Sequence, residues 1–402
     1  MQKIIGGIFL VASIAIGAGM LALPITTGVA GFTSSAIVFV VAFVVMLYSV
    51  LLLLEANLYS ASGSNVISMA KNYLGKYGQL VAWLMYLLLL YAVVAAYTSG
   101  GGSLFNAVLQ DVIGVNAPAW VGAGLFVLLF GFFVFFGTRS VDYLNRGLTL
   151  GLIVAYVALI LFVTPHIHMH LLSSGHAHYI WAAIPVIVLS FTSHLIVPSL
   201  RVYYKSNIKH LLIVLIVGSV IPLVLYLVWE LTVLGIVPVN GKDGLESIAG
   251  SQNSVTALTA ALTHFTGVAW LGRIANFFSF FALVTSFLGA SLSLSHFLKD
   301  GFKQGDHTRS RIWNIVLTYV PPFIFAMAYP RGFIAALSYG GVFIAVLFGI
   351  LPCLIVWKAR YRQQQHCGFR VPGGRVGLVL MMLVSVFIIV MQIAATLNLL
   401  PG

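Results

Sequence analysis

The stretch IIGGIFLVASIAIGAGMLALPITTGVAG, residues 4–31, contains no charged side chain and is longer than the ~20 residues that a membrane-spanning helix needs. The charge-free run continues to Leu54, which is far too long for the apolar part of a cleaved signal peptide, so we expect a retained span. Near its middle lie Gly17 and Gly19, followed by Pro24. Two glycines so close together weaken a helix where lipid offers no replacement hydrogen bonds. We therefore predict that the first helix is broken.

The composition extends the membrane interpretation to the whole chain. Of 402 residues, 7% are charged, against about 25% in an ordinary soluble domain, and 61% are hydrophobic. A soluble fold needs polar groups for its surface, so the composition excludes a cytosolic enzyme, a secreted disulfide scaffold and a disordered tail. The apolar runs are also longer than the alternating strands of an outer-membrane barrel. The sequence therefore predicts an all-α membrane protein.

The few charged residues divide the chain into eleven apolar stretches, each near the length of a membrane span. They lie at about 4–31, 33–56, 79–108, 119–138, 145–165, 178–201, 208–236, 271–298, 312–330, 332–357 and 376–400. We therefore expect 11 transmembrane helices in a single transporter-like domain that covers residues 1–402.

Lysine and arginine are distributed unevenly between the loops. With the N-terminus placed in the cytoplasm, only Lys242, Arg273 and Arg331 fall outside, so 17 of the 20 basic residues lie inside. Because positively charged loops stay in the cytoplasm, the N-terminus is predicted inside and the C-terminus outside. The net charge of +12 follows from this topology and predicts no nucleic-acid partner.

The sixth stretch carries a second interruption. Residues 190–194, Ser-Phe-Thr-Ser-His, are followed by Pro198, which lacks the N–H that a helix donates one turn back. Interrupted spans at matching positions in two halves are typical of transporters. Breaks in spans one and six predict a five-plus-five inverted repeat, with repeat one at about 4–165, repeat two at about 178–357 and an extra helix at about 376–400. The alternative is that the glycines only permit close helix packing.

Unwound backbone near the bilayer centre exposes N–H and C=O groups, which suit a zwitterionic substrate. The carboxylate is expected at the N–H groups from Gly17 to Met20, and the ammonium at carbonyls near Ser13–Ile16 and Phe191–Ser193. Aromatic residues of the third span could enclose a side chain, although they are as readily core residues. The candidate substrate-binding residues are Ile16, Gly17, Ala18, Gly19, Met20, Phe191, Thr192, Ser193, His194 and Tyr97.

Several motifs resemble those of a known family. They are IGAGMLALP (16–24), LLLLE (51–55), IPVI (184–187), VPS (197–199), TSFLG (285–289) and YPRGF (329–333). In order and spacing they resemble the bacterial tyrosine-specific permeases of the hydroxy/aromatic amino acid permease family, within the amino acid–polyamine–organocation superfamily. The resemblance implies a leucine-transporter-type fold and proton-driven uptake of an aromatic amino acid, tyrosine first, across the bacterial inner membrane. Tryptophan permeases share most of these motifs, so a tryptophan or broad aromatic substrate is the alternative.

Ionisable residues inside a membrane are costly, so the few present are candidates for carrying the coupling proton. His194 lies in the second break and can change charge near neutral pH, unless it is simply a neutral, hydrogen-bonded histidine. Glu55 lies near the inner end of the second span, where it can reach water. Glu230 lies within about two turns of the outer end of the seventh span, where the alternative is a solvated vestibule carboxylate. The family that the chain resembles carries a neutral amide near this position.

A sodium ion is the alternative coupling ion. On the eighth span, Ala282, Thr285 and Ser286 would face the first span, where Ser13 and Ile16 offer further oxygen atoms. Oxygen ligands suit a hard cation, and hydroxyls of this kind bind Na⁺ in related sodium-coupled folds. Thr285 and Ser286 could instead bond to their own helix.

Other function classes lack their signatures in this sequence. There is no Walker-type loop for ATP-driven pumping, and no nucleophile–base pair or metal motif within the spans for a membrane enzyme. Five histidines within residues 166–178 have metal-like spacing, which we interpret as chance affinity in an outer loop. The expectation is a transporter whose partners are an amino acid and membrane lipid, with no enzyme activity, no cofactor and no resident metal.

Overall fold

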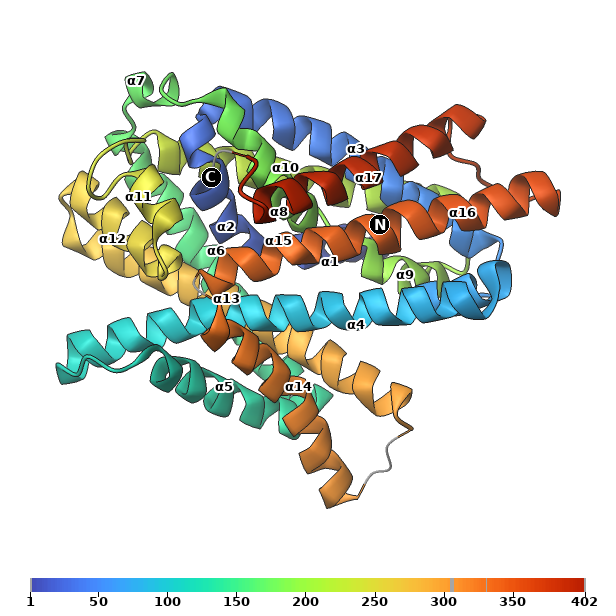
Figure 1. Cartoon of the computed structure of the whole chain (residues 1–402), viewed down its shortest axis with the longest axis horizontal. Coiled ribbons are helices and arrows are strands. Elements are labelled where there is room, and N and C mark those ends of the chain that lie inside the picture. The colour runs from blue at the N-terminus through green and yellow to red at the C-terminus, as the bar shows by residue number, and fades with distance from the viewer. Residues whose placement is uncertain (1, 304–306, 330, 401–402) are drawn as a thin grey trace.

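The computed structural model describes residues 2–303, 307–329 and 331–400, and helices dominate this part of the chain (Figure 1). The first seven helices are α1 (Gln2–Ala15), α2 (Ala18–Thr27), α3 (Phe32–Leu58), α4 (Val66–Val108), α5 (Ala119–Phe135), α6 (Thr138–Val163) and α7 (Met169–Leu172). The remaining ten are α8 (Ile180–Ser190), α9 (Val197–Tyr203), α10 (Ile208–Leu234), α11 (Leu245–Gly250), α12 (Ser254–Thr266), α13 (Ala269–Gly301), α14 (Thr308–Ala328), α15 (Gly332–Ile344), α16 (Leu351–Trp357) and α17 (Gly374–Thr396).

Short turns extend several of these helices. Turns of 3₁₀-helix cover Gly28–Ala30, Thr164–His166, Ala177–Tyr179 and His194–Ile196, and π-helical turns cover Leu109–Ile113, Ala345–Ile350 and Lys358–Arg362. The π-helical turn at 345–350 joins α15 and α16 into one long, irregular span.

Within the described residues, nine helical stretches are long and apolar enough to cross a membrane, and the bent pair α1–α2 makes a tenth. Their outward faces are apolar, as shown by Leu161 of α6 and Leu383 of α17, whose exposed fractions are 65% and 60%. Such side chains are stable in lipid rather than in water. The prediction of an all-helical membrane protein with many spans is therefore confirmed.

The helix α5 differs from its predicted stretch. It is apolar but has only 17 residues, and it ends at Phe135 rather than near 138. Gly137 has a φ of 89°, a conformation that side chains with a β-carbon rarely adopt, and α6 begins directly after it at Thr138. The loop predicted at 139–144 is therefore the first part of α6.

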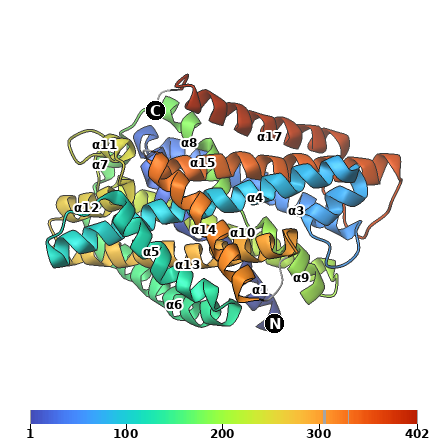
Figure 2. The same ribbon diagram turned by 60° about the horizontal axis from the view of Figure 1, so that its bottom comes forward.

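The buried side chains form two groups. The larger group joins α2, α3, α8, α10, α15 and α16 around the two broken spans. The smaller group lies between α4, α5, α13 and α14, where Phe126 packs edge-on against Phe130 and Phe287 at ring distances of 5.1 and 4.8 Å. The last helix, α17, lies at the outer edge against α8 and α15 (Figure 2). The broken spans are thus held in the interior.

Candidate functional site

The first break separates α1, which ends at Ala15, from α2, which begins at Ala18. Gly17 is extended, with φ −150° and ψ −152°, and the two helical segments meet at an angle of 49°. A β-carbon on Gly17 would lie 2.6 Å from the Ser286 hydroxyl of α13. A β-carbon on Gly19 would lie 2.7 Å from the Ser190 hydroxyl of α8. Both interpretations of these glycines therefore hold, because the helix breaks here and its neighbours also approach closely.

The backbone of this break matches the predicted carboxylate site only in part. The first turn of a helix leaves its N–H groups without partners inside the helix. The Met20 N–H, however, already donates to the Gly17 carbonyl at 3.0 Å. Met20 is therefore not a free donor, and the predicted group of free N–H donors shrinks to the residues from Gly17 to Gly19. The side chain of Ala18, another predicted site residue, lies outside the described part of the structure.

The second break begins where α8 ends, at Ser190. Residues 191–193 are irregular, a 3₁₀ turn covers His194–Ile196, and α9 follows. The carbonyl of His194 accepts a bond from the Val197 N–H, so it is not the free acceptor that Pro198 alone would suggest. The Thr192 hydroxyl donates back to the Val188 carbonyl at 3.2 Å. The Ser193 side chain is buried.

Tyr226 of α10 joins the two breaks. Its hydroxyl lies 2.6 Å from the Ala15 carbonyl and 2.8 Å from the Ser190 carbonyl, the last residues of α1 and α8. Carbonyls at helix ends have no partner inside their helix. A phenol carries a single proton, so it can fully satisfy only one of these two acceptors at a time. The Tyr226 side chain is fully buried, and its ring packs edge-on against Phe191 at 5.2 Å.

Sequence reasoning missed Tyr226 because its neighbours in the chain, Leu225 and Leu227, are ordinary apolar residues of a continuous span. One signal could have found it: Tyr226 is four residues before Glu230, so both lie on one face of α10. That face is the one turned toward the two breaks.

Of the predicted sodium ligands, Ile16 lies in the first break itself, and Ser286 reaches it from α13. Ser286 lies against Gly17, and its side chain interacts with Tyr97 of α4. Thr285 instead donates to the carbonyls of Phe281 and Ala282 within its own helix, at 2.8 and 3.2 Å. The structure therefore brings Tyr97 and Ser286 together.

Ser13 and Ala282 are two further predicted sodium ligands. The exposed Ser13 hydroxyl donates to the Leu10 carbonyl at 3.0 Å, again within its own helix. The Ala282 side chain is buried. The hydroxyls of Ser13 and Thr285 are thus each satisfied within their own helix, α1 and α13.

His194 points into the scaffold. Its Nε2 lies 2.9 Å from the Ser49 hydroxyl of α3, and its ring stacks on Phe348 at 4.7 Å. The single Ser49 proton goes to the Phe348 carbonyl at 2.5 Å, so Nε2 must be the donor toward Ser49. The ring is fully buried, and both partners belong to α3 and the α15–α16 turn rather than to the first break. The role of His194 in substrate binding or proton coupling stays a prediction, and its described contacts are with α3 and the α15–α16 turn.

Glu230 is buried, not solvated. Its side chain has no exposed surface, so the alternative of a vestibule carboxylate is wrong. One oxygen, Oε1, is hydrogen-bonded to the hydroxyl of Thr27, the last residue of α2. The other, Oε2, has no partner among the described residues. The Thr27 hydroxyl also donates to the Leu23 carbonyl at 2.7 Å.

Glu55 is buried too, and the expectation that it reaches water is wrong. Arg360 binds it with two nitrogen atoms, Nε at 2.5 Å from Oε1 and Nη2 against Oε2. The Val371 N–H donates to Oε2 at 2.8 Å, and the Tyr59 hydroxyl to Oε1 at 3.1 Å. Burial, then the Cys367 side chain and the Glu55 charge, raise the pKa of Tyr59, which stays a donor. Glu55 therefore holds the end of α3 to the segment after α16.

The comparisons with known proteins agree with this geometry. Residues 1–392 match the model of the tryptophan/tyrosine permease family. The chain belongs to this family. It is 34% identical to the tyrosine-specific transport system 1 of Haemophilus influenzae, over 100% of this chain and 99% of that one. It is 33% identical to that organism's tyrosine-specific transport system 2, over 96% and 95% of the two chains. It is also 33% identical to the tryptophan-specific transport protein of Pseudomonas aeruginosa, over 99% and 96%.

Membership confirms the resemblance seen in the sequence motifs. The protein is a permease of the aromatic amino acid family rather than an enzyme. Its apolar helices and the bacterial origin of these relatives agree with a multi-pass protein of the bacterial inner membrane.

Proposed function

We propose that this permease imports an aromatic amino acid, tyrosine first, together with a proton, by alternating access between two sides of the membrane. The observation that carries the proposal is the Tyr226 bridge between two interrupted spans, in a chain whose relatives are named as tyrosine- and tryptophan-specific transporters. A membrane potential of about 150 mV supplies roughly 3.5 kcal/mol per proton, enough for roughly 300-fold accumulation.

The proposed architecture has eleven spans, with the N-terminus inside and the C-terminus outside. The bent pair α1–α2 counts as the first span and the short apolar helix α5 as the fourth, which brings the nine longer stretches to eleven spans. The breaks after α1 and α8 support two inverted repeats of five spans, at about 4–165 and 178–357, in a leucine-transporter-type fold. The helix α17 is then the appended eleventh span.

The substrate is proposed to lie between the two breaks. Its carboxylate faces the N-terminus of α2 near Gly17 and Gly19, where helix N–H groups and the helix dipole favour an anion. Its ammonium binds the carbonyl oxygens of Ala15 and Ser190, which Tyr226 holds within hydrogen-bonding distance of one point. A zwitterion thus satisfies both ends of the broken helices.

The aromatic part of the substrate is proposed to lie beside Phe191. This ring follows directly after the Ser190 carbonyl and packs edge-on against Phe39 at 6.3 Å as well as against Tyr226. Edge-to-face contacts of this kind stabilise an added aromatic ring by about 1 kcal/mol beyond its burial. Tyr97 and Ser286 supply hydroxyls next to the first break.

The proton is proposed to bind Glu230, which of the two carboxylate candidates has the less complete set of hydrogen bonds. Glu55 is fully occupied by Arg360 and its other partners. Among the described residues, Glu230 Oε2 has no hydrogen-bond partner and no cation lies against the group. A buried carboxylate without a cation is costly, so this arrangement favours the neutral acid. The acid proton of Glu230 then forms a hydrogen bond to the Thr27 hydroxyl oxygen, because the proton of that hydroxyl is donated to the Leu23 carbonyl.

Uptake by purified protein in proteoliposomes tests the proposal. We expect labelled tyrosine to accumulate under an inward proton gradient without sodium, and a protonophore to abolish accumulation. Excess tryptophan and phenylalanine should compete, and leucine should not. Accumulation that requires sodium would identify Na⁺ rather than the proton as the coupling ion. Competition by tryptophan alone would identify tryptophan rather than tyrosine as the preferred substrate. Absence of uptake under either gradient, by folded protein, would overturn the proposal.

A further inference from the structure

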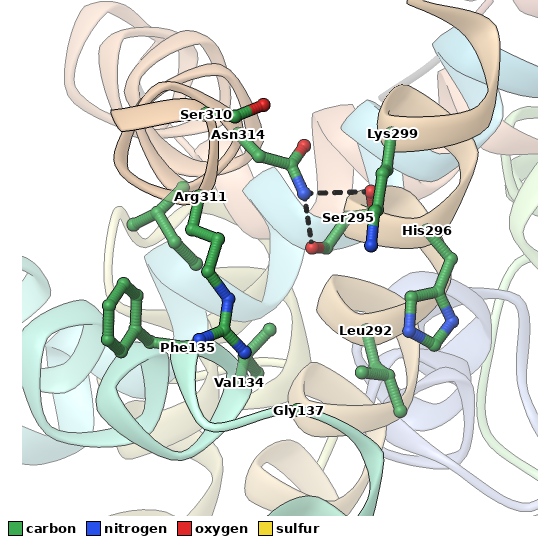
Figure 3. A pocket seen from close by; sticks show the side chains of 11 residues that line it. Val134, Phe135, Gly137, Leu292, Ser295, His296, Lys299, Ser310, Arg311 and Asn314 are labelled. Carbon is green, nitrogen blue, oxygen red and sulfur yellow. Dashed lines mark hydrogen bonds between the residues drawn. The ribbon is translucent and has the colours of Figure 1, made fainter. Parts of the chain in front are cut away.

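A basic pocket lies apart from the two breaks, where α13 ends, α14 begins and α5 ends (Figure 3). Its volume is about 90 Å³, which is several times the space that one water molecule needs. Lys299 and His296 reach it from α13, and Arg311 from α14. None of the described residues that line the pocket is acidic. Three potentially cationic groups on two helices therefore share one hollow.

The pocket is built from positioned side chains. The Asn314 amide donates to the backbone carbonyl and hydroxyl of Ser295 at 3.0 and 2.8 Å, and these residues are only 7% and 8% exposed. Because the Ser295 hydroxyl accepts here, its own proton is left to donate, and no described acceptor takes it. The Arg311 guanidinium lies over the Phe135 ring at 5.7 Å, which fixes its direction without using its N–H donors.

Charge balance also points to an external anion. Among the described residues, neither Arg311 nor His296 forms an ion pair with a carboxylate. Lys299 has a further contact of its own, so we assign the main contact to Arg311 and a supporting charge to Lys299. The N-terminus of the 21-residue helix α14, near Ser310, adds its positive end.

The surroundings indicate where this anion comes from. Three large apolar side chains directly follow a pocket residue or precede one in the chain, and they are 57%, 53% and 53% exposed: Phe136, Ile312 and Trp313. Exposed apolar and aromatic side chains beside basic residues are typical of the level at which lipid headgroups lie. A soluble anion would leave these three apolar side chains uncovered, whereas the acyl chains of a lipid would cover them.

We propose that this pocket binds the phosphate of an anionic phospholipid. Arg311 holds the phosphate oxygens, Ser295 donates one hydrogen bond, and the acyl chains follow the apolar surface beside Phe136 and Ile312. With the orientation given under Proposed function, on which this assignment of leaflet rests, the lipid belongs to the inner leaflet. Basic pockets between spans on this side of a membrane are recognised sites for such headgroups. The bound lipid would tie α5, α13 and α14 together at their inner ends.

Native mass spectrometry of the full chain in neutral detergent tests the site, with dioleoylphosphatidylglycerol and dioleoylphosphatidylcholine as probes. We expect the anionic lipid to bind more tightly, and the Arg311→Gln, Lys299→Gln double variant to weaken it roughly 30-fold, about fivefold per cation. The matched control is the Arg139→Gln, Arg146→Gln double variant. It removes the same charge from exposed positions of α6, outside the pocket.

Ser295→Ala keeps every charge and should weaken anionic lipid about fivefold, which tests the site even if the double variant does not fold. Equal loss in the control, or equal affinity for the two lipids, would reduce the pocket to general surface charge and overturn the proposal. Displacement of the lipid by millimolar inorganic phosphate or glycerol 3-phosphate would assign the pocket to a soluble anion instead. Tyrosine uptake is a separate readout, so its failure would leave this result standing.

Discussion

Removing one oxygen atom at the junction of the two breaks tests the substrate site. Tyr226→Phe keeps the ring against Phe191 but takes away the hydroxyl that contacts the carbonyls of Ala15 and Ser190. Tyr204→Phe is the matched control, because its hydroxyl also donates to a backbone carbonyl, that of Lys3 at 2.6 Å, near the start of α1 and far along the chain from its broken end. Both variants lose one phenol and keep an aromatic ring.

The magnitude follows from the number of bonds. One phenol proton is lost, so nothing holds the two carbonyls at one point, and the substrate ammonium loses a charge-assisted hydrogen bond to one of them, worth about 2 kcal/mol. The carbonyls of Ala15 and Ser190 are then free to drift apart, so the ammonium of the substrate loses a preformed site. We expect the dissociation constant for tyrosine to rise roughly 30-fold in Tyr226→Phe and less than threefold in Tyr204→Phe.

Binding of three ligands to purified protein separates a positioning role from a structural one. Tyrosine and tyramine carry the ammonium, and 3-(4-hydroxyphenyl)propionate lacks it. We expect Tyr226→Phe to weaken the first two ligands and to leave the third nearly unchanged. An equal loss for all three ligands, or no loss beyond that of the control, would refute the reasoning.

Three further predictions concern coupling and packing. Glu230→Gln should remove proton-driven accumulation, a loss of roughly 300-fold, while exchange of labelled for unlabelled tyrosine continues; full accumulation would contradict the assignment. Arg360→Met leaves Glu55 buried and unpaired, so the free energy of unfolding should fall by about 3–5 kcal/mol, and adding Glu55→Gln should recover most of it in a detergent unfolding assay. If Glu55→Gln does not restore the lost stability, the loss does not come from an unpaired, buried Glu55. Gly341→Ala places a β-carbon 2.2 Å from a backbone carbonyl oxygen of α8 and should cost about 1–3 kcal/mol. Gly289→Ala meets no atom within 4 Å and should be neutral in the same measurement.

The sequence predicted the local events of this fold well. Gly17 and Gly19 marked the first break, and the polar run before Pro198 marked the second. These predictions rest on the backbone preferences of single residues, because lipid offers no hydrogen bonds to replace those that a glycine or proline weakens or removes. The end of α5 was predicted less well, since the apolar run continues past Phe135 and only the conformation of Gly137 ends it.

The side-chain contacts could not be predicted, because they join residues far apart in the chain. Glu230 meets Thr27 across 203 residues, and Glu55 meets Arg360 across 305. A glutamate near the end of a span suggests contact with water, and only the packing of α2 or α16 shows that it is buried. The Tyr226 hydroxyl likewise depends on how α10 lies against both breaks at once.

A structure of the purified protein with bound tyrosine tests the central claim most directly. We predict the amino nitrogen within hydrogen-bonding distance of the Ala15 and Ser190 carbonyl oxygens, and the carboxylate at the start of α2 beside Gly17. The ring should lie against Phe191. Tyrosine bound elsewhere, with the Tyr226 bridge unchanged and nothing between the two breaks, would contradict the account.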